Sequence, residues 1–245
     1  MKTATVLTVS LSCLVLLGTG CKPSQPNAMT NDKDTATVST DLSGMKAESY
    51  PLDEFLKAWK FYGVGAFYDE SGRQACLEEG ENTSGTLIVS PKSYTGDVVV
   101  RYKVMTLNPA TVMITLLSLS DRGTSADLTL PEGYDGNMGY LEEVAENYFI
   151  AYRNSPHATT PFIRKHPDNA TLVAADEDCM LPGVYYDIET GRQGNRLWLK
   201  VDDRLIVETT DESPLSGGHV AIRARGLAGH PAACVIRDVT VYSRQ

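Results

Sequence analysis

Short runs of β-branched and alternating apolar residues, separated by Gly, Asp, Asn and Pro, recur along most of this 245-residue chain. Each run has the length of one strand, and turn residues bound it. The clearest runs span residues 85–90, 97–106, 111–119, 148–153, 196–201, 218–224 and 234–242. Strands at this spacing favour an antiparallel sandwich or jelly roll over a parallel βαβ sheet. The sequence therefore predicts an all-β fold.

Helical sequence is confined to two short stretches. Residues 53–59 open with acidic side chains, as the first turn of a helix does, and residues 140–147 have good helix composition beside predicted strands. Neither stretch is long enough to form a layer of its own. We therefore expect an all-β domain with a minor helical component.

The first 49 residues differ in composition from the rest of the chain. Lys2 precedes an apolar stretch at residues 6–17, and small residues follow. These are the parts of a secretory signal, and the apolar stretch is shorter than the roughly 20 residues that span a bilayer. We predict a signal peptide at residues 1–20 and a flexible tether, rich in Pro, Ser, Thr and Asn, at 21–49. The folded domain is predicted at 50–245.

Cys21 lies directly after the small residues of the signal. This arrangement resembles the lipobox of bacterial lipoproteins, although the usual Leu stands at Leu17, one position early. The resemblance implies that Cys21 carries a lipid such as palmitate and anchors the protein to a membrane. The implied location is the bacterial cell envelope, at the outer membrane or the periplasmic side. The alternative is a plain secretory signal that happens to contain Cys21.

The chain is acidic, with 31 Asp and Glu against 22 Lys and Arg, which gives a net charge of −9. Such a surface argues against binding nucleic acid through bulk electrostatics. We find no phosphate-binding glycine loop, no HExxH and no nucleophile elbow, so no cofactor or metal site is predicted. Asp176, Glu177 and Asp178 are the one calcium candidate, and a solvated acidic loop is the ordinary alternative.

Three cysteines, Cys76, Cys179 and Cys234, fall in the predicted domain. Their spacing matches no zinc pattern. Export permits a disulfide, and three thiols allow at most one. Cys76 and Cys234 lie in strand-like segments near opposite ends of the domain, and they are the preferred pair.

The last 50 or so residues carry the most recognisable organisation. Residues 195–208 form a predicted hairpin with Asp202 and Asp203 at the turn. A Pro-Leu pair, two glycines and the strands at 218–224 and 234–242 follow. This succession resembles the closing strands of the concanavalin-A-like lectin/glucanase superfamily, which includes laminin-G-type modules. It is also similar to lipoproteins of unknown function in bacterial polysaccharide-utilisation systems.

The resemblance implies a concanavalin-A-like β-sandwich, or jelly roll, whose concave sheet binds a polysaccharide or oligosaccharide. Enzymes of this superfamily are hydrolases or lyases. Retaining glucanases place two Glu and one Asp on one face of a strand at a period of two. Glu142, Glu143 and Glu146 lack the Asp and the alternation, which argues against retaining glucanase chemistry.

The groups that a polysaccharide lyase needs occur close together between residues 147 and 166. A lyase uses Tyr or His to remove the proton next to a carboxylate, and cations or amides to neutralise that carboxylate. Strand alternation puts Tyr148 and Tyr152 on one face and Arg153 on the other. We predict Tyr152 and His157 as catalytic groups that line the glycan-binding face.

Four further residues are predicted to contact the substrate: Asn154, Arg164, Arg153 and Tyr186. Arg164 would neutralise an anionic sugar, and Tyr186 offers an aromatic face to a pyranose ring. The sequence YFIAY at 148–152 resembles the YFKAG strand of alginate lyases, but the QIH and RSELR signatures of that family are missing. The alternative interpretation is structural, with Tyr148 and Phe149 packed in the core.

Three functions are therefore open. In the first, the domain binds or helps to process a polysaccharide at the cell surface. In the second, it is a lyase that cleaves a uronate-containing glycan. In the third, it is a non-catalytic structural or protein-interaction lipoprotein. Convergence of the predicted site residues on one groove would favour the first two functions, and a flat sheet without a groove would favour the third.

Overall fold

The structure is a computed structural model that describes residues 39–227 and 229–244. The predicted signal peptide at 1–20, Cys21 and residues 22–38 of the predicted tether lie outside the described residues. All described residues fall within one compact unit. In this part of the chain, no helix has both the length and the apolar composition needed to cross a membrane.

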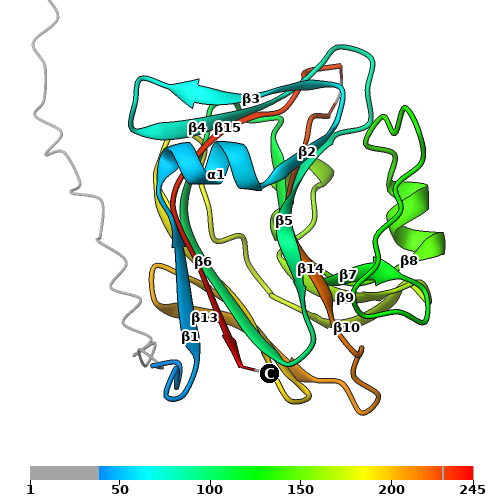
Figure 1. The fold of residues 1–245 in the computed structure, drawn as a ribbon. Coiled ribbons are helices and arrows are strands. Elements are labelled where there is room, and N and C mark those ends of the chain that lie inside the picture. The colour runs from blue at the N-terminus through cyan, green and yellow to red at the C-terminus, as the bar shows by residue number, and fades with distance from the viewer. Residues whose placement is uncertain (1–38, 228, 245) are drawn as a thin grey trace, which may run out of the picture. The chain divides into compact units, whose positions relative to one another are not determined.

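Two antiparallel sheets build the domain (Figure 1). Across the first sheet the strands are β13 (Arg204–Thr210), β12 (Arg196–Val201), β11 (Tyr186–Gln193), β6 (Asp97–Thr106), β15 (Ala233–Arg244), β4 (Gln74–Glu79) and β3 (Gly65–Glu70), and β1 (Lys46–Tyr50) pairs with β15. Across the second sheet they are β10 (Ala170–Ala174), β9 (Phe162–His166), β8 (Ala145–Arg153), β7 (Val112–Asp121), β14 (Gly218–Arg225), β5 (Thr86–Tyr94) and β2 (Lys60–Gly63). The predicted all-β sandwich is confirmed.

Large apolar side chains from both sheets fill the space between them. Alternate residues of each strand point inward, as a period of two requires. In β8 these are Tyr148, Ile150 and Tyr152, and they meet Val100 and Tyr102 of β6. Each of the five is at most 2% exposed. Burial of an apolar side chain of this size contributes roughly 1.5–3 kcal/mol relative to its exposed state.

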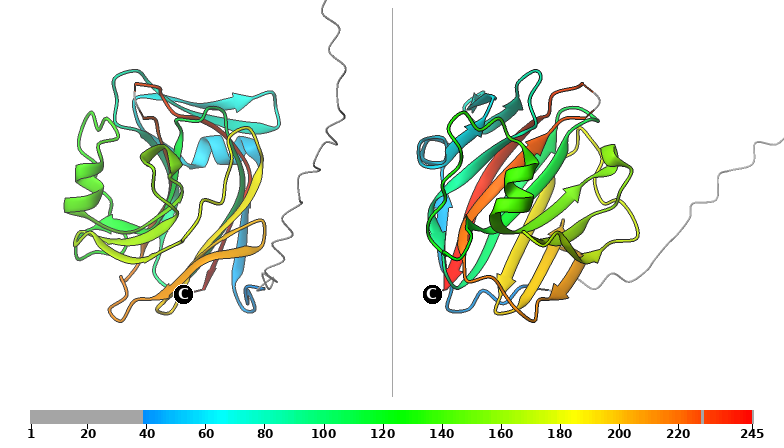
Figure 2. Two further views of the ribbon diagram at one scale, coloured as in Figure 1. Left: turned by 180° about the vertical axis from the view of Figure 1, so that it is seen from behind. Right: turned by 90° about the vertical axis from the view of Figure 1, so that its right-hand side faces the viewer.

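A second, smaller apolar cluster lies on the outer face of the second sheet. The connection between β7 and β8, residues 122–144, arches over this face (Figure 2) and contains the single π-helical turn η1 (Tyr140–Val144). Its Tyr134 and Leu141 pack with Leu116 and Phe149 of the sheet. The connection covers part of the outer face, and the part left open carries the groove described below.

Both predicted helical stretches contain a short helix. The first is α1 (Leu52–Ala58), where Phe55 is buried in the core. The predicted helix at 140–147 ends earlier than expected, because η1 stops at Val144 and Ala145 pairs with Asp121 in the sheet. Sheet pairing therefore overrides helix composition at this point.

The folded domain begins before the predicted boundary at residue 50. Strand β1 pairs with β15 from Lys46↔Ser243 to Tyr50↔Val239. β4 pairs only with residues 233–236 of β15, so β1 supplies the backbone partners for the other half of that edge. The sequence did not predict this strand because its side chains are mostly polar and exposed.

The preferred disulfide between Cys76 and Cys234 is wrong. All three cysteines of the described residues are free thiols. Cys76 stands opposite Val235, and Cys234 stands opposite Leu77, so the two thiols point to opposite faces of the sheet. Burial raises the pKa of the Cys76 thiol to about 11, which keeps it protonated and unreactive at neutral pH.

Candidate functional site

A groove of about 260 Å³ lies on the outer face of the second sheet, beside the 122–144 connection. Its apolar wall consists of Val112, Ile114, Met138, Phe149 and Phe162. Its polar wall consists of Glu142, Asn154, His157, Thr159, Arg164, Arg223 and Arg225. An apolar surface with a few convergent polar groups is the usual composition of a small-ligand site.

Two stacked phenyl rings form the base of the groove. Phe149 of β8 and Phe162 of β9 lie with ring centroids 5.9 Å apart and planes 12° from parallel. In the sheet register Phe149 stands opposite Arg164, and Phe162 stands opposite Ala151. All four residues therefore share the outer face. The Arg164 guanidinium lies 4.4 Å from the centroid of the Phe162 ring, so one wall of the groove is both cationic and aromatic.

Asn154 and His157 reach the groove from the turn that joins β8 to β9. Asn154 ends β8, and the 3₁₀ turn η2 (Ser155–His157) follows. The Asn154 amide donates a hydrogen bond to the Thr159 hydroxyl across this turn. Ala158 takes a left-handed conformation, with φ 54°, that reverses the chain toward β9. The hydrogen bond between Asn154 and Thr159 thus closes the turn. The His157 ring is exposed beside the groove.

His157 is a neutral imidazole at physiological pH. Although His157 is exposed at its outer side, partial desolvation of the ring beside the groove lowers its pKa below the ordinary value of 6.5, and the positive charges of Arg225 and Arg223 lower it further. A neutral imidazole offers one donor and one acceptor nitrogen to a ligand. It is also the form that could accept a proton.

Three of the six predicted catalytic and substrate-binding residues meet in this groove. They are Asn154, His157 and Arg164. The sequence placed them together because they follow one another along β8, η2 and β9. Their convergence is the arrangement expected for the first two of the three functional alternatives.

Tyr152 does not share this groove. Its side chain is 0% exposed between the sheets, and its hydroxyl accepts a hydrogen bond of 2.9 Å from Tyr102. Burial raises the pKa of Tyr152 well above its ordinary value of 10.0, so its hydroxyl stays protonated. The predicted alternation of β8 is correct, but Tyr152 points to the interior face rather than to the glycan-binding face.

Arg153 and Tyr186 also lie away from the groove. Arg153 is 3% exposed, and its guanidinium donates to the carbonyl oxygens of Thr111 and Pro109, which ties β8 to the start of β7. Tyr186 is on β11 in the first sheet, and its hydroxyl accepts a hydrogen bond of 3.0 Å from the Leu181 amide. Neither side chain lines the groove.

The sequence analysis did not identify Arg223 and Arg225 as groove residues. They stand two positions apart on β14, and Ile222 and Ala224, which alternate with them, are in the core between the sheets. The strand alternation that places these two arginines outward was visible in the sequence. Once Ile222 and Ala224 are assigned to the interior, the period of two puts both arginines on the outer face.

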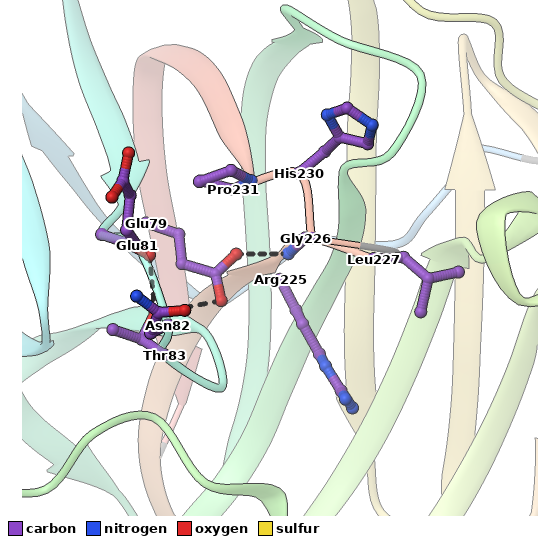
Figure 3. A pocket seen from close by; sticks show the side chains of 11 residues that line it. Glu79, Glu81, Asn82, Thr83, Arg225, Gly226, Leu227, His230 and Pro231 are labelled. Atoms are coloured by element: carbon purple, nitrogen blue, oxygen red, sulfur yellow. Dashed lines mark hydrogen bonds between the residues drawn. The ribbon is translucent and has the colours of Figure 1, made fainter.

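A second hollow of about 390 Å³, here called the rim pocket, adjoins the groove (Figure 3). It lies between residues 79–83 and the β14–β15 connection, and Arg225 lines both hollows. Glu79 holds the two segments together. Its carboxylate accepts hydrogen bonds from the Ala232 amide at 2.9 Å, from the Gly226 amide and from the Thr83 hydroxyl. The shared arginine means that one extended ligand could contact both hollows.

The described residues contain no group of three or more His, Cys, Asp or Glu side chains placed to share a metal ion. Asp176, Glu177 and Asp178 lie on the connection between β10 and β11, outside both the groove and the rim pocket. The polar groups that the groove presents are those of Glu142, Asn154, His157, Thr159 and its three arginines.

Solved structures with this arrangement of strands are numerous. A protein of unknown function with a galectin-like fold from Bacillus subtilis matches 82% of this chain and 100% of its own length, with a TM-score of 0.68 at 15% identity. The domain has the concanavalin-A-like jelly-roll fold. The predicted superfamily resemblance is thus confirmed for the fold.

Two further structures with the concanavalin-A-like jelly roll are similar to this chain over most of their length. The carbohydrate-binding module CBM66 of Bacillus subtilis matches 76% of this chain and 96% of its own, with a TM-score of 0.51 at 17% identity. The β-glucanase of Bacillus licheniformis matches 82% and 99%, with a TM-score of 0.51 at 12% identity. No protein-family model and no curated protein matches the sequence. At these identities the likeness establishes the fold alone.

Proposed function

We propose that this protein binds a glycan in the groove on the outer face of the second sheet. The observation that carries the proposal is the meeting of Asn154, His157 and Arg164 above the stacked rings of Phe149 and Phe162. A sugar ring presents an apolar face of C–H groups and a rim of hydroxyls. Phe149 and Phe162 are each 8% exposed, so the parts of them that face the groove, together with Val112, Ile114 and Met138, match the first. The amide, imidazole and guanidinium match the second.

The adjoining rim pocket supports a polymeric ligand. Arg225 lines both hollows, so a chain that places one sugar in the groove can extend past this residue. The rim pocket is open and mostly polar, with Asn82, Thr83 and His230 around it. Hydroxyl-rich ligands pair well with such groups. A carbohydrate-binding module and a β-glucanase among the structures with the same fold also support this choice of ligand.

Binding is favoured over cleavage by the position of Tyr152. A lyase base must reach the substrate, and this hydroxyl is enclosed in the core. One observation keeps cleavage as a second candidate: His157 is a neutral imidazole in the groove beside Arg225. Incubation with uronate polysaccharides separates the two. Release of unsaturated product, abolished by His157→Ala, would establish the lyase, and intact polymer with retained affinity would establish the binder.

Native gel electrophoresis in the presence of a panel of polysaccharides, with His157→Ala and a control variant, tests the binding proposal. The purified mature chain is expected to be retarded in native gels that contain its glycan. His157→Ala is expected to weaken that affinity about three- to tenfold, because one hydrogen bond to the ligand is lost. Arg204→Ala is the control, since Arg204 is exposed on β13 of the first sheet and lines neither the groove nor the rim pocket. Unchanged affinity in His157→Ala, or no retardation by any glycan, would reject the proposal.

We also propose that a lipid on Cys21 holds the domain at the bacterial cell envelope. The support is the signal-like sequence before Cys21 and the polar stretch after it. Labelled palmitate is expected to enter the wild-type protein, which fractionates with membranes. Cys21→Ser is expected to take up no label and to leave the membrane fraction. A Cys21→Ser protein that remains in membranes would contradict this anchor, and the equivalent change Cys179→Ser is the control.

A further inference from the structure

Three arginines surround the groove without a carboxylate partner. Arg164 comes from β9, and Arg223 and Arg225 come from β14. Within residues 39–227 and 229–244, none of the three forms an ion pair. By contrast, Arg101 and Arg196 on the first sheet are each paired with a glutamate. Three unpaired guanidiniums in one groove are unusual in a chain whose acidic residues outnumber its basic ones.

Arg223 is the innermost of the three. Its side chain is 0% exposed, and its Nη2 donates to the carbonyl oxygens of Ser84 and Gly136. Its Nε has no hydrogen-bond partner among the described residues. Burial lowers the pKa of Arg223 to about 10, so the group still carries its charge at neutral pH. A buried cation without a direct ion pair is costly, and a bound anion would relieve that cost.

The backbone leaves space for this guanidinium. A Cβ atom at Gly85 would lie 2.6 Å from Nη2 of Arg223, and Gly85 has a φ of +122° that other residues rarely adopt. Glycine therefore suits position 85 for two reasons: it tolerates the positive φ, and it has no Cβ that would collide with the Arg223 guanidinium. The backbone of the sheet therefore accommodates the buried Arg223 guanidinium at a defined position.

The carboxylates nearby offset the positive charge of the groove only in part: burial lowers the pKa of Arg223, and it outweighs the charges of Glu79 and Glu142, which raise that pKa. Glu142 is the one acid that lines it, and it forms no ion pair with any of the three arginines in the described part of the chain. Glu79, at the adjoining rim pocket, is occupied by the Gly226 and Ala232 amides. After burial, the positive charges of Arg225 and Arg223 are the further causes that lower the pKa of His157 in this groove.

We infer that the groove selects acidic glycans, with the carboxylate or sulfate group of one sugar held between Arg225 and Arg164 above the buried charge of Arg223. The inference rests on the proposed function, because it names the class of glycan that the same groove takes. Guanidinium groups bind carboxylates and sulfates through paired N–H donors. Loss of one such contact is expected to weaken binding at least about tenfold.

Calorimetric titration of the mature chain with matched oligosaccharides tests the inference. The probes are galacturonate, glucuronate and mannuronate trisaccharides, each beside its carboxyl-reduced neutral form, and a sulfated galactose trisaccharide. At least one acidic probe is expected to bind about tenfold or more tightly than its neutral form. Added salt should weaken that preference, since screening acts on charge pairs. Comparison of the affinities for the uronate and the sulfated trisaccharides shows which anion the groove prefers.

Two arginine variants locate the effect. Arg225→Gln is expected to remove most of the preference for the acidic probe, measured as the ratio of acidic to neutral affinity, because glutamine keeps an amide donor for sugar hydroxyls but carries no charge. Arg204→Gln is the matched control, because Arg204 is exposed on β13 of the first sheet. Thermal unfolding of Arg225→Gln at the wild-type temperature shows that the variant is folded. Because Arg223 is buried, its replacement could disturb folding, and it is not needed for the test.

The outcomes separate the two proposals. If neutral and acidic probes bind equally, or if Arg225→Gln keeps the acidic preference, the inference is overturned while glycan binding stands. If no probe or neutral glycan binds at all, glycan binding fails and the inference fails with it. An acidic preference that is lost in Arg225→Gln and kept in Arg204→Gln supports both.

Discussion

Replacing Glu189 by alanine is expected to lower the free energy of unfolding by about 3–5 kcal/mol. Glu189 is 6% exposed on β11, and in the sheet it stands directly between Arg101 and Lys200. Its carboxylate accepts from Arg101 Nε at 2.7 Å and from the Trp198 indole at 2.7 Å, and it lies 3.2 Å from Lys200 Nζ. Alanine removes the carboxylate on which these three donors converge, and two of them, Trp198 and Lys200, are buried. Urea unfolding at neutral pH measures the change.

A matched glutamate on the same sheet is the control for this prediction. Glu208 pairs with Arg196, but both side chains are about one-third exposed, so Glu208→Ala should cost less than about 1 kcal/mol. Thr40 also donates a hydrogen bond to Glu189, so the residues just before β1 depend on the same carboxylate. A Glu189→Ala protein as stable as Glu208→Ala would show that this network does not stabilise the fold.

Asp211→Ala is expected to lower the free energy of unfolding by about 2–3 kcal/mol at neutral pH. The Asp211 carboxylate accepts from the Tyr148 hydroxyl at 2.7 Å and lies 2.8 Å from Lys165 Nζ. The Leu215 amide in turn donates to Tyr148 at 2.9 Å. This network fastens β8 and β9, which carry the groove, to the connection before β14. The neighbouring Glu212 is exposed, and Glu212→Ala should change stability by less than about 0.5 kcal/mol.

The contribution of Asp211 depends on pH. Burial raises its pKa, but hydrogen bonds from Lys165, Tyr148 and the Ser213 amide outweigh burial and hold the pKa below the ordinary value of 3.8. A carboxyl with a lowered pKa in the folded state stabilises the fold above its ordinary pKa. That stabilisation is lost as pH falls through the lowered value. The difference between wild type and Asp211→Ala should therefore be largest near neutral pH and shrink below about pH 4. A difference independent of pH would contradict this account.

Most of the sandwich could be predicted from strand periodicity. The predicted strand at 97–106 has the same bounds as β6, because three valines follow Asp97, apolar residues then alternate with Arg101 and Lys103, and turns bound it on both sides. Strand β1 was not predicted, because its side chains are mostly exposed and its role is to satisfy the backbone of β15. A strand held by main-chain pairing alone leaves little trace in hydrophobic pattern.

The site was predicted in part, and the missing part has a physical cause. Alternation divides β8 into two faces, but Tyr148 and Phe149 are both large aromatics, so either face could have been the interior. The structure turns Tyr148 and Tyr152 inward and Phe149 outward. Asn154 and His157 escape this ambiguity because they lie in the turn beyond the strand. Both line the groove for that reason, and Tyr152 does not.

The arginines of β14 show a second reason why the groove could not be fully predicted from the sequence. Their side chains reach the groove only because β14 pairs with β7, which brings them next to β8 and β9. The pairing joins residues more than 50 positions apart in sequence. No local pattern reports such an order of strands, although the outward direction of both arginines follows from alternation alone.

A crystal structure of the mature chain with its tightest-binding oligosaccharide tests the central claim most directly. We expect one sugar ring over Phe149 and Phe162, with its polar groups within hydrogen-bond distance of Asn154 and His157. If the sugar instead lies on the outer face of the first sheet, or in the rim pocket without touching the groove, the assignment of the groove as the glycan site is wrong.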